Sequence, residues 1–129
     1  MPASDKPVYI EVPFCKVISE NNKWDHWSKK RKRRISQSGI VRVALKSNGV
    51  NVTLPCLIRL IRFGARKLDD DNLPGALKFV RDAVADWLIP GLLPGRADGD
   101  PRLKWEYEQI AGEPGVRIEI IPFVKDEYN

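Results

Sequence analysis

The clearest pattern along the chain is an apolar stripe with helical spacing between residues 73 and 88. Its apolar side chains recur every three or four positions, which places them on one face of a helix of about four turns. Asp71 or Asn72 can cap this helix, and Pro74 suits a first turn, where N–H groups lack intrahelical partners. The pattern predicts an amphipathic helix beginning within a residue or two of residue 73. The stripe consists of Leu73, Ala76, Leu77, Val80, Ala83, Val84, Trp87 and Leu88.

In the first half of the chain, two segments have the composition of β-strands. Residues 7–12 form a short β-rich run that Pro13 ends. Residues 50–63 form a longer apolar run, which predicts a central strand with a break near Pro55. Between them, residues 40–46 alternate loosely enough for either a helix or a strand.

In the second half, Pro and Gly residues mark 89–101 as a loop, and two further strands follow it. These strands cover residues 103–110 and 116–123, and residues 112–115 are the turn of a predicted hairpin. We therefore expect an α+β fold. It would be a single compact domain over residues 1–129, with a mixed β-sheet packed against one long amphipathic helix and a basic N-terminal segment.

Length and composition are those of an ordinary globular domain. A chain of 129 residues can bury roughly 65 to 70% of its unfolded surface. With 43% hydrophobic and 30% charged residues, it resembles neither a disordered chain nor a fibre. No apolar run is long enough to cross a bilayer, and residues 1–7 lack the apolar core of a secretory signal. We expect no membrane association and an intracellular protein.

The chain has only two cysteines and one histidine, which limits the sites that these residues could form. Cys15 and Cys56 lie in apolar surroundings and do not form a CxxC pair, so we interpret both as reduced packing residues. With His26 as the one histidine, a zinc site is not expected. His26 stands between two tryptophans, Trp24 and Trp27, and we favour a packing or DNA-contact role over catalysis. Either tryptophan could pack in the core or stack on unpaired bases.

The charged residues indicate a kind of partner, because 22 basic residues against 17 acidic ones give a net charge of +5. This balance favours a polyanionic partner. Six consecutive cations are its focus, and we expect them to contact nucleic-acid phosphates. A solvated helix face and a nuclear-import or RNA-binding tract are the alternatives. Arg66 and Lys67, with Arg59 and Arg62, could extend the positive surface. The six cations are Lys29, Lys30, Arg31, Lys32, Arg33 and Arg34.

Acidic residues gather at two positions of this basic chain. Asp69, Asp70 and Asp71 precede the predicted helix, and Asp98 and Asp100 lie in the Gly- and Pro-rich loop. In extended backbone, residues two apart point to one face about 6.6 Å apart, so Asp69 and Asp71 could converge on one cation. The alternative is a helix cap with acids near the positive end of the helix dipole. An EF-hand does not fit the spacing.

A divalent cation would reconcile the two kinds of charge. Carboxylates repel phosphate unless a cation lies between them, and Mg²⁺ takes one or two carboxylates together with substrate phosphate oxygens. If the carboxylates hold a metal, Mg²⁺ would therefore resolve this conflict of charge, and we expect no small-molecule cofactor.

At these motifs the chain resembles the RusA-type Holliday junction resolvases, and in particular their phage-borne relatives. The similarity covers residues 8–121, with a weaker match in the Asn- and Trp-containing segment 21–27. The stronger motifs are Asp69-x-Asp71-Asn72-Leu73, the helix over 76–84, and Asp98-Gly99-Asp100-Pro101-Arg102.

The resemblance implies a homodimeric, Mg²⁺- or Mn²⁺-dependent endonuclease that nicks four-way DNA junctions symmetrically, in the cytoplasm of a bacterial or phage-infected cell. Asp69 and Asp71 match the family's first acidic motif. Asp98 matches its later metal ligand, with Asp100 as the next choice. The family commonly has a lysine where this chain has Gly75. Lys78 or Lys67 would then supply the assisting cation.

Two other classes of function compete with this expectation. A non-catalytic nucleic-acid-binding module would use residues 29–34, and Asp69 to Asp71 would only cap a helix. An adaptor protein would instead use its apolar helix stripe to bind a partner. The first predicts DNA binding without cleavage, and the second predicts no salt-dependent retention of DNA.

Overall fold

A computed structural model of the chain describes residues 3–13, 15, 17, 27–93 and 95–123. Asn21, Trp24 and His26, about which the sequence raised hypotheses, lie outside the described residues. The strands are β1 (Val8–Pro13), β2 (Cys56–Gly64), β3 (Leu103–Ala111) and β4 (Gly115–Pro122). The helices are α1 (Trp27–Ser47), α2 (Leu73–Ala76), α3 (Lys78–Leu88) and the 3₁₀-helix η1 (Ala97–Gly99).

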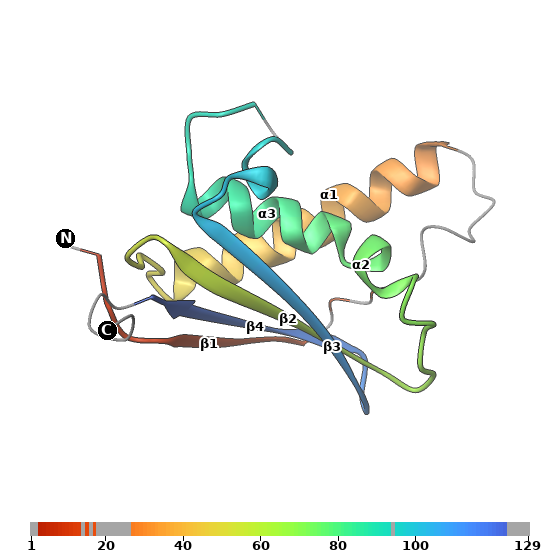
Figure 1. The fold of residues 1–129 in the computed structure, drawn as a ribbon. Helices are drawn as coiled ribbons and strands as arrows, with labels where there is room; N and C mark the ends of the chain where they lie inside the picture. The colour runs from red at the N-terminus through yellow and green to blue at the C-terminus, as the bar shows by residue number, and fades with distance from the viewer. Residues whose placement is uncertain (1–2, 14, 16, 18–26, 94, 124–129) are drawn as a thin grey trace.

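The four strands form one mixed sheet in the order β1-β4-β2-β3. β4 runs antiparallel to both β1 and β2, whereas β2 and β3 are parallel. α1 and α3 lie together on one side of the sheet, and none of the helices in the described ranges covers its other side (Figure 1). The expected α+β class with a mixed sheet is confirmed.

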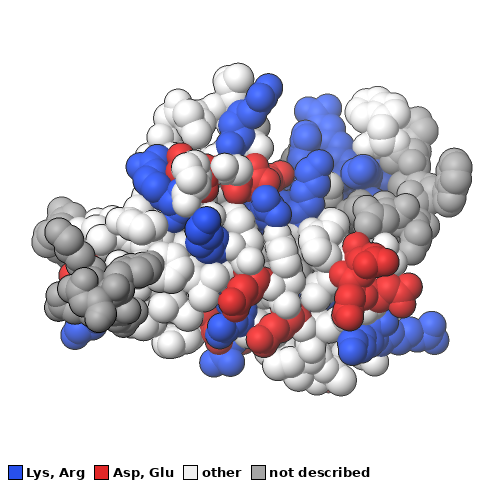
Figure 2. All heavy atoms as spheres, viewed as in Figure 1, with Lys and Arg blue, Asp and Glu red and all other residues white. Residues whose placement is uncertain are grey.

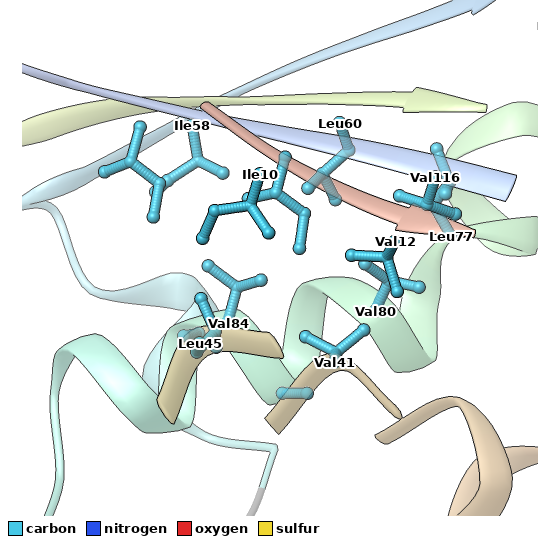
Figure 3. Close-up of a cluster of buried hydrophobic side chains, with 14 of the residues drawn as sticks. Ile10, Val12, Val41, Leu45, Ile58, Leu60, Leu77, Val80, Val84 and Val116 are labelled. Atoms are coloured by element: carbon cyan, nitrogen blue, oxygen red, sulfur yellow. The ribbon is translucent and has the colours of Figure 1, made fainter. Parts of the chain in front are cut away.

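The core lies between the helices and the sheet. Ile58 and Leu60 of β2 point toward Val80 and Val84 of α3, with Val41 of α1 beside them (Figure 3). All five side chains are buried. Each apolar side chain removed from water stabilises the fold by roughly 1.5 to 3 kcal/mol before conformational entropy is subtracted. The core fixes α1 beside α3, so their polar sides face outward together.

α1 resolves the open choice for residues 40–46 in favour of a helix. It is also the longest of the described helices, because the basic run at residues 29–34 and the segment 40–46 belong to the same helix. Gln37, Val41 and Leu45 recur every fourth residue and are its buried positions. Much of the rest of α1 is exposed to solvent, as the run of cations requires.

The helix predicted over residues 73–88 is present but broken. It begins at Leu73, as expected, and Pro74 lies in its first turn. The backbone leaves helical geometry at Leu77, so a short α2 and a longer α3 replace one continuous helix. Asn72 occupies the capping position without a side-chain cap hydrogen bond. The predicted cap is right in position, but the described structure does not show its hydrogen bond.

Two strand predictions need correction. β2 begins at Cys56, directly after Pro55, and Val52 contributes only an isolated bridge to Ser4. The predicted hairpin over 112–115 is wrong, because β3 and β4 are separated by β2. β3 alternates charged and half-buried residues, which suits a sheet edge, whereas β4 is mostly buried and fits between β1 and β2.

Both cysteines are buried and neither forms a disulfide, as expected. Burial raises the pKa of each thiol, Cys15 and Cys56, to about 11. Within the described part of the chain, no helix has the length and apolar character needed to cross a membrane.

Candidate nucleic-acid interface

The N-terminal half of α1 carries the predicted cation run on its surface. Lys29, Lys30, Arg31, Lys32 and Arg34 are exposed. Within the described ranges, no ion pair joins any of these five side chains to a carboxylate. In Figure 2, basic atoms gather where the N-terminal end of α1 lies. Their charge is therefore available to an anionic partner, which they would hold by releasing its counterions.

A groove between α1 and α3 runs beside these cations. Its first part is a hollow of about 290 Å³ lined by Trp27, Lys30, Arg31, Arg34 and Lys78, among others. Trp27 is 67% exposed at this end. The structure thus brings Lys78, predicted as a catalytic cation, next to the basic run.

The second part of the groove is a larger hollow of about 490 Å³. Arg34 lines both parts, so they adjoin, and Arg42 continues the basic side along α1. Gly39 lies between them on α1, and a side chain added there would meet open space. From α3, Asp82 and Asp86 form the acidic side of this part. The groove therefore changes from purely basic to mixed charge along its length.

Asp82 is the acidic residue with the most perturbed environment in the groove. Burial raises the pKa of its carboxyl, and the nearby negative charge of Asp98 raises that pKa further. Lys78 and Arg81 oppose this effect. A carboxylate whose ionisation is disfavoured by burial and by a neighbouring negative charge would be stabilised by an added cation.

Asp98 itself is held in place by α3 and β3. Its carboxylate forms an ion pair with Arg81 Nε at 3.1 Å, and its backbone carbonyl accepts a hydrogen bond from Trp105 Nε1 at 2.9 Å. Arg81 also stacks 5.1 Å from the centre of the Trp105 ring and donates to the Tyr107 hydroxyl. Asp98 is therefore fixed in orientation next to the acidic side of the groove.

Asp100, the second choice for a ligand, is engaged elsewhere. Arg102 donates to its carboxylate from Nε and Nη2, each at 3.0 Å, and from its backbone N–H at 2.9 Å. These hydrogen bonds lower the pKa of Asp100 to about 2. Because Arg102 occupies both oxygens of Asp100, the geometry favours Asp98 over Asp100 as the later acidic residue.

The first acidic motif lies in a turn. The backbone N–H of Asn72 donates to the Asp69 carbonyl at 2.9 Å, and Asp69, Asp70 and Asp71 are all exposed. The extended backbone that the metal interpretation requires over residues 69–71 is not present, because residues 70–72 form a turn before α2. The alternation that would point Asp69 and Asp71 to one face does not apply to a turn.

The predicted ligands are not gathered at one point. The turn at 69–71 follows β2, whereas Asp98 precedes β3, and these two strands are parallel. The two acidic motifs therefore lie at opposite ends of the strand pair. In the ranges that the structure covers, no group of three or more His, Cys, Asp or Glu residues could hold a metal ion.

Arg66 and Lys67, the remaining predicted DNA contacts, lie after the end of β2 and away from the groove. Both are exposed, and they line a small hollow with Arg62. Arg59 does not extend the basic surface, because Glu106 and Glu119 bind it on the open side of the sheet at 3.0 Å each.

Sequence reasoning missed Asp82, Asp86 and Arg42. The signal was available in their spacing, since Lys78, Asp82 and Asp86 recur every fourth residue on the polar side of α3. Arg42 lies eight residues after Arg34, about two helical turns, and therefore on the same side of α1. The spacing alone gave no indication that these two helix faces meet, because that depends on how the core packs.

No family model, no curated protein and no solved structure matches the chain. The geometry of the site therefore carries the functional argument.

Proposed function

We propose that the protein binds nucleic acid through the groove between α1 and α3. The observation that carries this proposal is the alignment of Lys30, Arg31, Arg34 and Lys78 along one open hollow, with no ion pair in the described chain to a carboxylate. Each phosphate that these cations neutralise would release counterions, so binding would weaken steeply with salt. Trp27 at the open end offers a ring on which an unpaired base could stack.

A variant that fills the groove without changing its charge tests this proposal. Gly39→Phe places a ring in open space on α1, and replacing a mid-helix glycine does not weaken the helix. We expect its affinity for a four-way DNA junction to fall at least about tenfold, because the ring blocks close approach of phosphates. Ser36→Phe, on an exposed part of the same helix outside the lining of the groove, is the matched control. Equal affinity of both variants and the unchanged protein would contradict the proposal.

A second proposal is that the bound nucleic acid is branched DNA, which the protein cleaves as a structure-selective endonuclease. Resemblance of the two acidic motifs to the RusA-type resolvases favours it, as does the pair Asp82 and Asp98 beside the basic groove. Carboxylates at that position repel a phosphate, so a protein that only bound phosphates would bind them more weakly because of these residues. A twofold dimer, which the resemblance also implies, would suit the symmetric nicking of a junction.

The resemblance implies Mg²⁺, and the described residues meet its needs in part. Mg²⁺ in nucleotide-processing sites is held by one or two carboxylates together with substrate phosphates. Asp82 and Asp98 are near enough for their charges to interact and would supply those carboxylates. When bound, the ion would polarise the phosphate and lower the pKa of a water molecule. Asp69 and Asp71 lie at the other end of β2 and do not join them in this arrangement.

Side chains in and beside the groove would bind the phosphate and position a carboxylate. Lys78 and Arg34 would bind the phosphate and balance the negative charge that develops on its oxygens during hydrolysis. Arg81 would act as a positioning residue, because its ion pair with Asp98 and its stacking on Trp105 fix the orientation of that carboxylate. Ordered side chains of this kind lower the cost of organising a reaction site.

Cleavage of a labelled four-way junction in Mg²⁺ tests the second proposal. We expect the unchanged protein to nick the junction and Asp98→Asn to lose this activity. Asp71→Asn decides whether the turn before α2 takes part, and Asp70→Asn is its control in the same turn with the same change of charge. Absence of nicking by the unchanged protein, or full activity of Asp98→Asn, would exclude the second proposal and leave the first intact.

A further inference from the structure

Arg62 is a buried cation on the core side of the sheet. It lies on the central strand β2, in line with Ile58 and Leu60, and is only 8% exposed. Burial lowers the pKa of its guanidinium. In the part of the chain that the structure describes, no carboxylate forms an ion pair with it. A buried charge is costly unless a partner compensates it, so this position calls for an anion.

The hydrogen bonds of Arg62 hold the guanidinium in place without neutralising it. Nε donates to the carbonyl of Val17 at 3.1 Å, and Nη1 donates to the carbonyl of Arg66 at 2.9 Å. Arginine has five N–H donors, so these two bonds to described residues leave three that can meet another acceptor. Gly64 makes room for the group, because a Cβ there would lie 2.8 Å from Arg62 Nη2.

A hollow of about 150 Å³ opens beside this guanidinium, and two further cations line it, Arg66 and Lys67. Its wall is fixed by Gln109, whose amide oxygen accepts from the Leu68 N–H at 2.9 Å and whose amide nitrogen donates to the Leu68 carbonyl at 2.6 Å. This pair of bonds ties the segment after β2 to β3. The three cations are thus held around one small space rather than scattered on a loop.

We propose that this hollow, lined by Arg62, Arg66 and Lys67, is a binding site for a phosphate group. A tetrahedral oxyanion fits this hollow, because it accepts several hydrogen bonds from guanidinium groups. Its negative charge would also compensate the buried positive charge of Arg62. The hollow shares no lining residue with the groove between α1 and α3. Its phosphate could come from free phosphate or from the backbone of a nucleic acid.

Binding of inorganic phosphate to the full chain is the primary test. Phosphate should bind in a 1:1 ratio by calorimetry and raise the melting temperature above that in KCl of equal ionic strength. The double variant Arg66→Gln/Lys67→Gln, with both changes on the surface, should bind phosphate at least about tenfold more weakly, because charge-assisted hydrogen bonds are lost. The control Lys6→Gln/Lys104→Gln removes the same charge from exposed positions outside the hollow and should keep full affinity.

Gly64→Ala tests the role of the buried guanidinium separately. Its methyl group would displace Arg62, so phosphate affinity should fall even though no charge changes. Circular dichroism would establish that the variant is folded. Phosphate that stabilises no better than KCl, or a double variant with the affinity of the unchanged protein, would overturn the proposal.

The source of the phosphate is decided by a second arm with junction DNA. If the DNA backbone occupies the hollow, Arg66→Gln/Lys67→Gln lowers affinity for DNA as well, and free phosphate competes with DNA. If free phosphate is the ligand, the double variant loses phosphate binding and keeps its DNA affinity. Both results support the site, and neither depends on whether Gly39→Phe blocks the groove.

Discussion

The two sides of the sheet carry similar charged residues and use them in opposite ways. On the open side, Arg59 binds Glu106 and Glu119 at 3.0 Å each, and Arg117 approaches Glu11 at 2.9 Å. These charges compensate each other within the protein. On the helix side, the cations at the start of α1 project into solvent (Figure 2). A count of basic residues does not distinguish the two surfaces, whereas the location of their partners does.

The largest expected effect is on DNA affinity. Replacing Lys30, Arg31 and Arg34 together by Gln should lower affinity for a four-way junction by about a hundredfold at low salt, because three phosphate contacts are lost. The slope of log affinity against log salt concentration should fall by about 0.9 for each contact. Fluorescence anisotropy across a salt series measures both quantities.

A control with the same change of charge sharpens the comparison. Replacing Lys6, Lys46 and Lys104 by Gln removes three exposed cations that lie outside the groove. This variant should lose little affinity and keep the slope of the unchanged protein. An equal loss in the two triple variants would mean that net charge, and not the groove, determines binding.

The next effect is on stability and concerns the open side of the sheet. Arg59→Met should destabilise the fold by about 1 to 3 kcal/mol, because Glu119, whose side chain is only 9% exposed, loses its closest partner. DNA affinity should not change. Urea unfolding, with Lys104→Met as a surface control, measures the difference. Loss of DNA binding by folded Arg59→Met would contradict the division of roles between the two sides.

The smallest effect is a pH dependence at Asp82. Its pKa is raised in the folded state, so the carboxylate form costs stability once the pH rises above the ordinary value of about 3.9. Asp82→Asn should therefore stabilise the protein at pH 7 by roughly a few tenths of a kcal/mol after solvent screening, and not at pH 3. Melting temperatures at both pH values, with Asp5→Asn as a control, test this. A destabilised Asp82→Asn at pH 7 would show that Asp82 has a favourable partner.

Local signals in the sequence were enough for the fold class and for several of the elements. The start of the helix at Leu73, the strands β1 and β3, and the exposure of five of the six cations over residues 29–34 follow from spacing and residue type. The break at Leu77 was not predicted, since the apolar spacing continues through it. In this case periodicity reports which side of the helix is buried and not whether the axis is continuous.

Long-range arrangement limited what could be said of the site. Nothing in residues 112–115 indicates that β4 passes β3 and pairs with β2, because a short Gly-containing turn is also typical of a hairpin. The same limitation affects Asp71 and Asp98, whose distance in space depends on β2 and β3 being parallel. Arg62 was grouped with the surface cations, and its burial follows only from its register on β2.

The position of β4 also bears on how the protein is made. β1 has its only described partner in β4, so the strand that leaves the ribosome first must wait for the one that leaves last. Until then one edge of β2 is unpaired as well, and its backbone N–H and C=O groups are open to pairing with other chains. Translation that stalls before residue 115 would therefore leave a nascent polypeptide prone to aggregation, with its cationic helix already formed beside cellular polyanions.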